Sequence, residues 1–347
     1  NITYHFIGEN KMWNTIQCAV QGKSHIKTGV PCQDKTYSLF LNGVKVIALA
    51  DGAGSAKLSH YGAESSTKFI CQELAENFDS YFLNEDGLSV KQLLIKKILE
   101  KLTEKSKTLE CEIKDLASTL LVVAIKENNF IISHIGDGVI GYLKNDELKI
   151  ASQPENGEFI NTTVFTTSKD AIMTMKLIKG NLGDINGFIL MSDGTEESLY
   201  NKKTKSLADV LKKIMNSSLI LNTEILQEQL QYSFENVIRE KTIDDCSIVI
   251  LTKEDILFKG YKELSNIEKA KLLNINLQNK IPEKWLIKRY DNILNFLENK
   301  ATLKEVAKYI YLKPKYLKKY LFKLQQLNFI ERNGKLFKTI LILEKNC

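Results

Sequence analysis

Short apolar runs alternate with long amphipathic stretches along most of the chain, and this alternation limits the folds that it can adopt. The runs are rich in valine and isoleucine and have the length of strands buried on at least one face. The predicted strands are Ile16–Val20, Val44–Ala50, Thr119–Ile125, Phe130–Ile135, Val139–Leu143, Gly187–Met191 and Cys246–Leu251. The predicted helices are Tyr61–Asn77, Ser89–Thr108, Ser206–Met215 and Glu224–Arg239. This order favours an α+β fold, with helices layered on antiparallel sheets, over a doubly wound parallel sheet.

The composition excludes several classes of protein. An apolar fraction of 44% in 347 residues is too high for a disordered chain, and the length suggests about two domains. Apolar runs such as Leu120–Ile125 are far shorter than the ~20 residues that span a bilayer, which argues against a membrane protein. Six scattered cysteines without a Cys-x-x-Cys pair argue against a zinc ribbon or a disulfide-stapled scaffold. Since no signal segment is visible at the start, we expect reduced thiols and a cytoplasmic protein.

The net charge of +6 is unevenly distributed along the chain. Residues 260–347 contain 19 Lys and Arg against 8 Asp and Glu, whereas the preceding residues contain 29 against 34. Such asymmetry indicates two modules with different tasks, one of which could meet an anionic partner. We therefore expect one domain over residues 1–255 and a second, basic domain over residues 260–347.

The second module has the pattern of a small, mostly helical domain. Thr302 can cap a helix and Pro314 can occupy a first helical turn. The predicted helices are Trp285–Leu297, Thr302–Tyr309 and Pro314–Leu327. Two apolar runs then flank Asn333-Gly334, a two-residue hairpin signal. Three helices followed by a hairpin resemble a winged helix, and its expected core is Trp285, Ile293, Phe296, Val306, Leu317, Leu321 and Leu324.

Aspartates stand where several predicted strands begin or end. Asp51 and Asp193 each follow a strand and precede a glycine, and Asp137 lies between two strands. Asp34, Asp244 and Asp245 each precede an apolar run. Strand ends can meet at one rim of a sheet sandwich, and clustered carboxylates with few imidazoles suit Mg²⁺ or Mn²⁺ better than zinc. The alternative is a set of turn aspartates that cap backbone amides.

Together these sites resemble the successive signature motifs of a known family. The motifs are Ala48–Gly54, Ala117–Thr119, Ile135–Gly138, Met191–Gly194 and Asp244–Ser247. They look like those of the metal-dependent protein serine/threonine phosphatases of the PPM type, and they occur in the family's order. Gln21–His25 with Pro31–Asp34 looks like the opening motif of the bacterial branch, and Glu155–Phe159 is similar to the segment before its flap. The resemblance covers about residues 12–253.

The resemblance implies a fold, a reaction and a set of site residues. The fold would be a four-layer αββα sandwich of two antiparallel sheets with outer helices. The site would hold two Mn²⁺ or Mg²⁺ ions, with a third in many members, and would activate a bridging water to attack phosphoserine or phosphothreonine. The implied metal ligands are Asp34, Asp51, Gly52 through its carbonyl, Asp137, Asp193 and Asp244. The implied catalytic residues are Asp51, Asp34 and His25.

The chain departs from the family pattern at several positions. Gln33 stands where a Glu is common, and Ala53 stands where many eukaryotic members have a His proposed as a general acid. His25, with Lys23 and Lys27 nearby, replaces an Arg that grips the substrate phosphate in many members. His25 could equally be a loop residue whose polar atoms bind backbone. The last motif leaves two candidate ligands, of which Asp244 matches the family position better than Asp245.

Two functions from different classes follow. The first is a cytosolic serine/threonine phosphatase that acts on a phosphoprotein and opposes a kinase. The second is a phosphatase-like sensor or regulator of weak or no activity with a C-terminal DNA- or protein-binding module. In either case the basic module could bind nucleic acid weakly, through Lys313, Lys315, Lys318, Lys319 and Lys323. Because base readout depends on arginine and this module has only Arg289 and Arg332, we favour a protein-docking adaptor.

Overall fold

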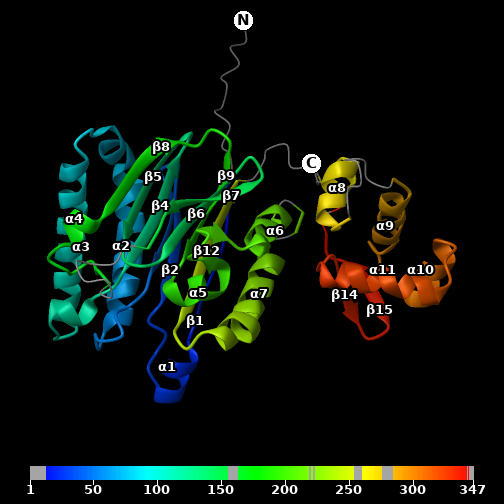
Figure 1. The fold of residues 1–347 in the computed structure, drawn as a ribbon, viewed down its shortest axis with the longest axis horizontal. Coiled ribbons are helices and arrows are strands. Elements are labelled where there is room, and N and C mark those ends of the chain that lie inside the picture. The colour runs from blue at the N-terminus through cyan, green and yellow to red at the C-terminus, as the bar shows by residue number, and fades with distance from the viewer. Residues whose placement is uncertain are drawn as a thin grey trace, which may run out of the picture. The chain divides into compact units, whose positions relative to one another are not determined.

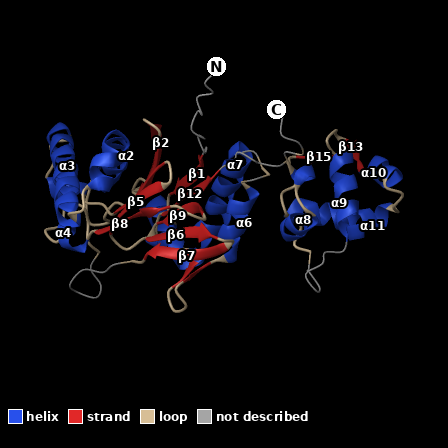
Figure 2. Ribbon diagram, turned by 90° about the horizontal axis from the view of Figure 1, so that it is seen from above, coloured by secondary structure: helices blue, strands red, loops and turns tan. Residues whose placement is uncertain are grey.

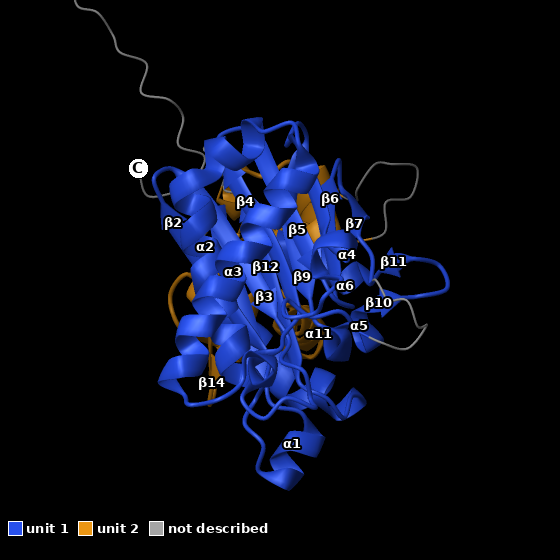
Figure 3. Ribbon diagram, turned by 90° about the vertical axis from the view of Figure 1, so that its left-hand side faces the viewer, with its two compact units in different colours: residues 1–215, 227–254 blue, residues 216–226, 255–347 orange. Residues whose placement is uncertain are grey.

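The chain divides into two compact units in the computed structural model, which describes residues 13–154, 163–218, 220–221, 223–253, 260–275, 284–341 and 343. One unit comprises residues 1–215 and 227–254, and the other comprises residues 216–226 and 255–347 (Figure 3). The predicted boundary near Asp255, the segment Glu155–Phe159 and Cys347 lie outside the described residues. The charge pattern assigns residues 216–226 to the first module, whereas the structure groups them with the second unit. In the structure, Leu221 forms an antiparallel bridge with Leu341.

The first unit is built on two five-stranded sheets in which all neighbouring strands are antiparallel (Figure 1). One sheet contains, in spatial order, β1 (Trp13–Val20), β12 (Cys246–Lys253), β9 (Ile185–Met191), β6 (Val139–Lys144) and β7 (Glu147–Ser152). The other contains β2 (Lys35–Leu41), β3 (Val44–Ala50), β4 (Leu120–Lys126), β5 (Asn129–Ile135) and β8 (Lys176–Asn181). The prediction of an α+β fold with antiparallel sheets is therefore confirmed.

Strands β3 and β4 are apolar throughout because both of their faces are covered. In β3, Val46 and Ala48 pack in the core beneath the helices, whereas Ile47 and Leu49 pack in the core between the sheets. The same alternation in β4 follows from the two-residue period of a strand. A strand buried on both faces reads as a continuous run of aliphatic residues, which is why these two strands are visible in the sequence.

Helices cover the outer faces of the sheets (Figures 1 and 2). Helices α2 (Ser59–Leu83), which kinks at Asn77, and α3 (Gly87–Thr108) pack over the β2–β8 sheet. Met215 of α6 (Asp209–Ser217) packs at Gly187 of β9. Gln227 of α7 (Thr223–Ser233) exchanges two hydrogen bonds with the Gln17 backbone of β1. Shorter elements are α1 (Lys23–Thr28), α4 (Ala171–Thr174), α5 (Asp193–Leu199), β10 (Tyr200–Asn201), β11 (Ser206–Leu207) and the 3-10 turn Ile113–Leu116.

Some element boundaries differ from the prediction. Ser206 and Leu207 pair in β11 with β10, so the helix predicted from Ser206 begins at Asp209. The helix predicted to Arg239 is α-helical only as far as Ser233. Residues Phe234–Ile238 then form a π-turn. Strands β2, β7 and β8 were not predicted from the sequence. All three are edge strands whose side chains are mostly half-buried or exposed, so no continuous apolar run marks them.

The second unit contains helices and a small antiparallel sheet. The helices are α8 (Asn266–Leu272), α9 (Lys284–Phe296), α10 (Leu303–Tyr309) and α11 (Pro314–Gln326). The strands pair in the order β13 (Ala301–Thr302), β15 (Leu336–Thr339) and β14 (Ile330–Asn333). Thr302 caps α10 in a capping box with Glu305, and Pro314 opens α11, as predicted. The hairpin turn is shifted by one residue, to Gly334-Lys335, because Asn333 already pairs with Leu336.

One predicted core residue of this unit is wrong. Trp285 is 58% exposed, and Arg289 lies over its ring. The inner face of α9 is formed instead by Ile287, Tyr290, Ile293 and Leu294, at the three- and four-residue spacing of a helix. Trp285 stands on the opposite side of that helix. Phe296 is partly buried and stacks on Tyr309, with ring centroids 4.3 Å apart. Within the described part of the chain, every helix is too short or too polar to cross a membrane.

Candidate metal centre

Asp51 is fixed by its backbone at the point where β3 ends. Its N–H donates to Thr119 Oγ1 over 2.8 Å, and its carbonyl accepts from the Thr119 N–H over 2.8 Å. Gly52 forms an antiparallel bridge with Ser118, and the Ala53 N–H donates to the Ala117 carbonyl. The segment Ala117–Thr119 therefore acts through its backbone and the Thr119 hydroxyl. It holds the Asp51 loop against the start of β4.

Three strand-end aspartates meet at one rim of the two sheets. One carboxylate oxygen from each of Asp51, Asp137 and Asp193 lies within 4.8 Å of the others. Asp137 stands between β5 and β6 and accepts a hydrogen bond from Thr163. Asp193 begins α5, where its Oδ1 accepts from the Gly194 N–H over 2.6 Å. Strand ends that are far apart in sequence thus bring three carboxylates together, as the sequence predicts.

Asp34 is the most deeply buried carboxylate of the group. It is 1% exposed and lies close to the Asp51 carboxyl and to the hydroxyls of Ser192 and Ser247. Neither of its oxygens makes a regular hydrogen bond to a described residue. A buried carboxylate costs several kcal/mol unless a cation or a donor compensates it. Among the described residues, Asp34 therefore has two hydroxyls and a carboxyl close by rather than well-aligned donors.

The carboxyl groups of this cluster disfavour each other's ionisation. Burial raises the pKa of Asp34 to about 6, and the Asp245 charge adds to this effect. Burial, followed by the charge of Asp137, raises the pKa of Asp193 to about 8. The pKa of Asp51 lies well above its ordinary value because of burial and of the Asp34 and Asp193 charges. Clustered carboxyls with raised pKa values fit a site that binds hard divalent cations, which would compensate the repulsion.

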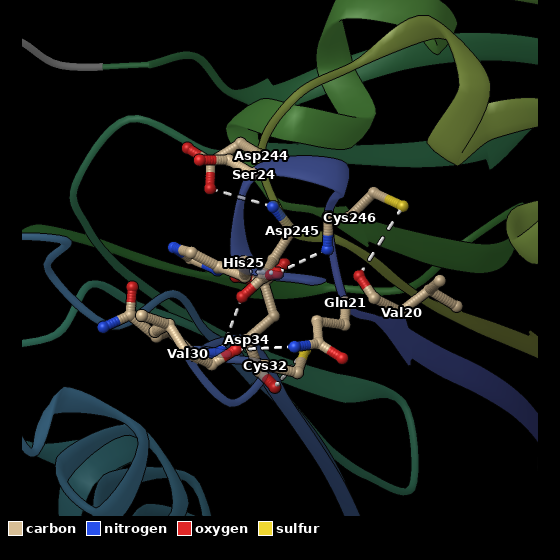
Figure 4. Close-up of polar contacts among 12 residues, drawn as sticks. Val20, Gln21, Ser24, His25, Val30, Cys32, Asp34, Asp244, Asp245 and Cys246 are labelled. Carbon is tan, nitrogen blue, oxygen red and sulfur yellow. Dashed lines mark hydrogen bonds and ion pairs between the residues drawn. The ribbon is translucent and has the colours of Figure 1, made fainter. Parts of the chain in front are cut away.

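Asp244 and Asp245 are adjacent but have different surroundings. Asp245 is buried, and its two oxygens accept from the backbone N–H groups of Gly22 and Gln33, each over 2.6 Å. Figure 4 shows the Asp245 side chain close to that of His25. Asp244 is exposed, accepts from the Asp245 N–H over 2.8 Å, and lies close enough to Asp51 and Asp193 to raise their pKa values. The outward carboxylate near the cluster is therefore Asp244.

Two glycines allow the loops of this rim to approach closely. A Cβ on Gly194 would lie 2.1 Å from the Asp245 carbonyl oxygen, and a Cβ on Gly22 would lie 2.2 Å from the Asp244 carbonyl carbon. Real Cβ atoms do not approach backbone this closely, so any larger residue would separate these segments. The glycine after Asp193 thus allows α5 to start against the last loop before β12.

The residues at which the chain departs from the family pattern have defined contacts. His25 lies on α1, and its Nδ1 is 2.9 Å from Asp245 Oδ1. The Gln33 side chain donates to Ser59 Oγ over 2.7 Å, beneath Gly52, whereas Ala53 is buried among small residues. Lys23 donates to the Glu240 carbonyl over 2.7 Å, and Lys27 is exposed. One predicted alternative for His25 is that its polar atoms bind backbone. In the structure, Nδ1 lies instead next to the Asp245 carboxylate.

Two side chains near the cluster were missed by the sequence analysis. Asp245 was considered only as a rival ligand, and no sequence signal indicates that it binds two amides more than 200 residues away. Glu196, one turn into α5, is 1% exposed and pairs with Lys202 at 2.6 Å. Burial raises its pKa, and the Asp137 charge contributes. An acidic residue in a first helical turn is common at exposed positions, so its burial could not be predicted.

Comparisons with known proteins agree with this architecture. A family model described as protein phosphatase 2C matches residues 21–235. The chain is 24% identical over 252 residues to the serine/threonine-protein phosphatase 3 of Escherichia coli strain K12, covering 69% of this chain and 97% of that protein. The solved structure of the serine/threonine phosphatase Stp1 from Staphylococcus aureus is similar with 17% identity and a TM-score of 0.50, over 73% of this chain and 100% of that one. The catalytic domain of the serine/threonine phosphatase PstP, solved in complex with two manganese ions, is 15% identical with a TM-score of 0.49, over 70% of this chain and 99% of that one.

Proposed function

The chain belongs to the protein phosphatase 2C family, whose model matches more than half of its residues, and we propose that the carboxylate cluster is the metal centre at which it hydrolyses phosphate esters. The enzyme is a metal-dependent serine/threonine protein phosphatase. The observation that carries the placement of its site is the approach of Asp51, Asp137 and Asp193 carboxylate oxygens to within 4.8 Å, beside the buried Asp34.

Each carboxylate has a proposed role. Asp51 would hold both divalent ions, and the Gly52 carbonyl would bind one of them through water. Asp193 and Asp244 would complete the ligands of one ion, directly or through water. The choice of Asp244 over Asp245 is supported by the two backbone amides that already occupy the Asp245 oxygens. Asp34 would hydrogen-bond a metal-bound water or bind metal weakly, and its lack of a regular hydrogen-bond partner among the described residues supports this role.

Two bound ions would lower the pKa of a shared water and neutralise the phosphoryl oxygens. All the proposed donors are oxygens, which favours Mn²⁺ or Mg²⁺ over zinc. Asp137 together with Asp193 is the proposed site of a third ion. His25 takes the place of the phosphate-binding arginine and contacts the substrate phosphate. The proposed substrate is a phosphoprotein in the cytoplasm that a cognate serine/threonine kinase modifies.

A simple assay separates this function from the alternative of a phosphatase-like regulator. The full chain is incubated with a generic aryl phosphate ester and a phosphothreonine peptide, with added Mn²⁺, with Mg²⁺ or with EDTA. We expect hydrolysis of both substrates with the divalent ion and none with EDTA. Metal binding without hydrolysis of either substrate would favour the regulator.

For the second unit we propose a winged-helix-like domain over residues 260–347 that docks a protein partner, in addition to a phosphatase domain over residues 1–255. The helices α9 to α11 and the β14–β15 hairpin support this topology. Lys315, Lys318 and Lys319 lie on the exposed side of α11 together with Phe322, which is 61% exposed. Lys323 is engaged by the Asn274 carbonyl at 3.2 Å and is less available to a ligand.

Binding to nucleic acid distinguishes the two roles of this domain. We expect only weak binding of the full chain to duplex DNA, with an affinity that falls steeply as salt increases because lysine–phosphate contacts release counterions. Tight and sequence-selective binding at about 200 mM salt would overturn the adaptor and favour a DNA-binding role. The matched variant replaces Lys315, Lys318 and Lys319 by Gln, and it should abolish the weak binding.

A further inference from the structure

One buried carboxylate ties together the loop that carries both His25 and Asp34. Asp245 Oδ1 accepts from the Gly22 N–H and Oδ2 accepts from the Gln33 N–H, each over 2.6 Å. These two amides lie at the beginning and the end of that loop. A single side chain, next to the proposed ligand Asp244, therefore sets the position of the whole segment at the metal centre.

The same carboxylate also contacts a side chain of the loop. His25 Nδ1 lies 2.9 Å from Asp245 Oδ1, and the His25 side chain is 15% exposed. The contact has the distance of an ion pair without the alignment of a hydrogen bond in this structure. Polar contacts of catalytic groups are often poorly aligned before substrate binds. A carboxylate at Nδ1 selects one ring orientation and leaves Nε2 as the nitrogen that is available to a substrate.

The helix that carries His25 is itself anchored to the segment before β12. The Ser24 N–H donates to the Ile243 carbonyl over 3.0 Å, and Lys23 Nζ donates to the Glu240 carbonyl over 2.7 Å. Two hydrogen bonds thus hold the start of helix α1 beside the segment before Asp245, although none of its side chains is fully buried. This anchoring is consistent with an orienting role for Asp245.

We propose that Asp245 is a positioning residue that orients the His25 ring so that Nε2 reaches a phosphoryl oxygen of the substrate. This inference rests on the proposed function of the carboxylate cluster. With Nδ1 directed at the Asp245 carboxylate, Nε2 is the ring nitrogen that can face the phosphate. The ring thereby replaces the fork of an arginine with a group whose direction is set by a second residue.

The test compares Asp245→Asn in two backgrounds of the full chain, with kcat and KM measured on an aryl phosphate at saturating Mn²⁺. With His25 present, we expect Asp245→Asn to raise KM by about tenfold or more, as does His25→Gln, and the double variant to be no worse than the worse single one. In the His25→Arg background, Asp245→Asn should have a much smaller effect, since the guanidinium presents several donors and does not need one carboxylate to orient a ring nitrogen. Equal losses of activity in both backgrounds, or losses that add to those of His25→Gln, would overturn the proposal. They would indicate that Asp245 acts only by holding the loop in place.

A spectroscopic measurement covers the case in which Asp245→Asn folds poorly or the chain proves inactive. Nitrogen-15 NMR of the Mg²⁺-loaded parent, with His25→Gln identifying the signal, reports which ring nitrogen carries the proton when the ring is neutral. We expect the proton on Nδ1, next to Asp245, and a downfield shift of the Nε2 signal. A neutral ring protonated at Nε2 would contradict the proposal, and Lys27→Gln on the same helix is the matched control that should leave the signal unchanged.

Discussion

Asp51 is the residue on which the proposed metal centre depends most. Burial, followed by the charges of Asp34 and Asp193, raises the pKa of its carboxyl well above the ordinary value. We predict that Asp51→Asn lowers Mn²⁺-dependent hydrolysis by at least about a thousandfold, because an amide supplies one neutral oxygen where two charged ones are required. Circular dichroism and thermal unfolding check that the fold persists. Activity within threefold of the parent would exclude Asp51 as the bridging ligand.

The other two aspartates of the trio should behave differently from each other. Asp193→Asn should be nearly as damaging as Asp51→Asn, because Asp193 is proposed as a ligand of a principal ion. Asp137→Asn should mainly raise the Mn²⁺ concentration that gives half-maximal activity, because its proposed site is that of a third ion. Activity measured across a Mn²⁺ titration distinguishes the two cases. Identical titration curves for both variants would contradict the assignment.

The raised pKa values predict how stability without metal depends on pH. The pKa values of Asp34 and Asp193, about 6 and about 8, exceed those of an unfolded chain. Between about pH 4 and 8 the folded protein therefore binds more protons than the unfolded one, so the contribution of these groups to stability falls as pH rises. We expect a metal-free Tm lower at pH 8 than at pH 6, measured in EDTA by calorimetry. Asp34→Asn should weaken this dependence.

Bound metal should reverse that trend. Divalent ions bind the ionised carboxylates, so they compete with protons and stabilise the protein more at pH 8 than at pH 6. At a free ion concentration one hundred times Kd, the stabilisation from one site is about 2.7 kcal/mol. The difference in Tm with and without Mn²⁺ at the two pH values measures this effect. A larger metal-induced shift at pH 6 would contradict the raised pKa values.

Individual residues differ in how well the sequence predicts them. Asp51, Asp137 and Asp193 could be found because each follows or joins an apolar strand, and strand ends share a rim. The separation of Asp244 from Asp245 needed the structure, since only the folded chain brings Gly22 and Gln33 to Asp245. A hydrogen bond across more than 200 residues leaves no local pattern in the sequence.

At the scale of elements, the start of α5 depends on the absence of a side chain at Gly194. A Cβ added at this position would lie 2.1 Å from the Asp245 carbonyl oxygen, so Gly194→Ala must separate α5 from the loop before β12. We predict a loss of stability of about 1–3 kcal/mol and a larger than tenfold loss of activity, because Asp193 moves with the helix. Chemical denaturation and a Mn²⁺ titration measure the two effects.

Gly87→Ala is the matched control for that substitution. A Cβ at Gly87, the first residue of α3, would meet nothing within 4 Å, so the change should leave activity intact and leave stability unchanged or slightly higher. Equal behaviour of the two alanine variants would show that close packing at Gly194 is unimportant.

Elements were predictable where burial is strong. Strands β3, β4 and β12 are buried along nearly their whole length and were found within one or two residues of their ends. The edge strands β2 and β8 carry lysine, glycine and polar residues, because one side of an edge strand faces water, and their sequences resemble loops. In α9, the amphipathic pattern was correct, but a large aromatic residue at its exposed start was mistaken for core.

At the scale of the whole molecule, the motifs before residue 254 and the charge split predict that catalysis is confined to the first unit. Every proposed site residue precedes the end of β12, which pairs on both sides with β1 and β9. We predict that a chain ending near Asp255 retains metal-dependent hydrolysis of a small phosphate ester, with kcat within about threefold of the parent. Because residues 216–226 group with the second unit, the truncation also removes surroundings of a segment that the shortened chain retains.

That segment predicts a specific difference between activity and stability in the shortened chain. Ile220 and Leu221 are buried, and truncation removes Leu341, the bridge partner of Leu221. The exposed aliphatic side chains should lower solubility and reduce Tm by a few degrees, since about 1 kcal/mol shifts the Tm of a domain of this size by 2–4 °C. The matched control replaces Ile220 and Leu221 by Ser in the shortened chain, which should restore solubility without changing kcat. If truncation instead abolishes hydrolysis while Mn²⁺ still raises Tm, the basic unit contributes to catalysis and the division into two modules is wrong.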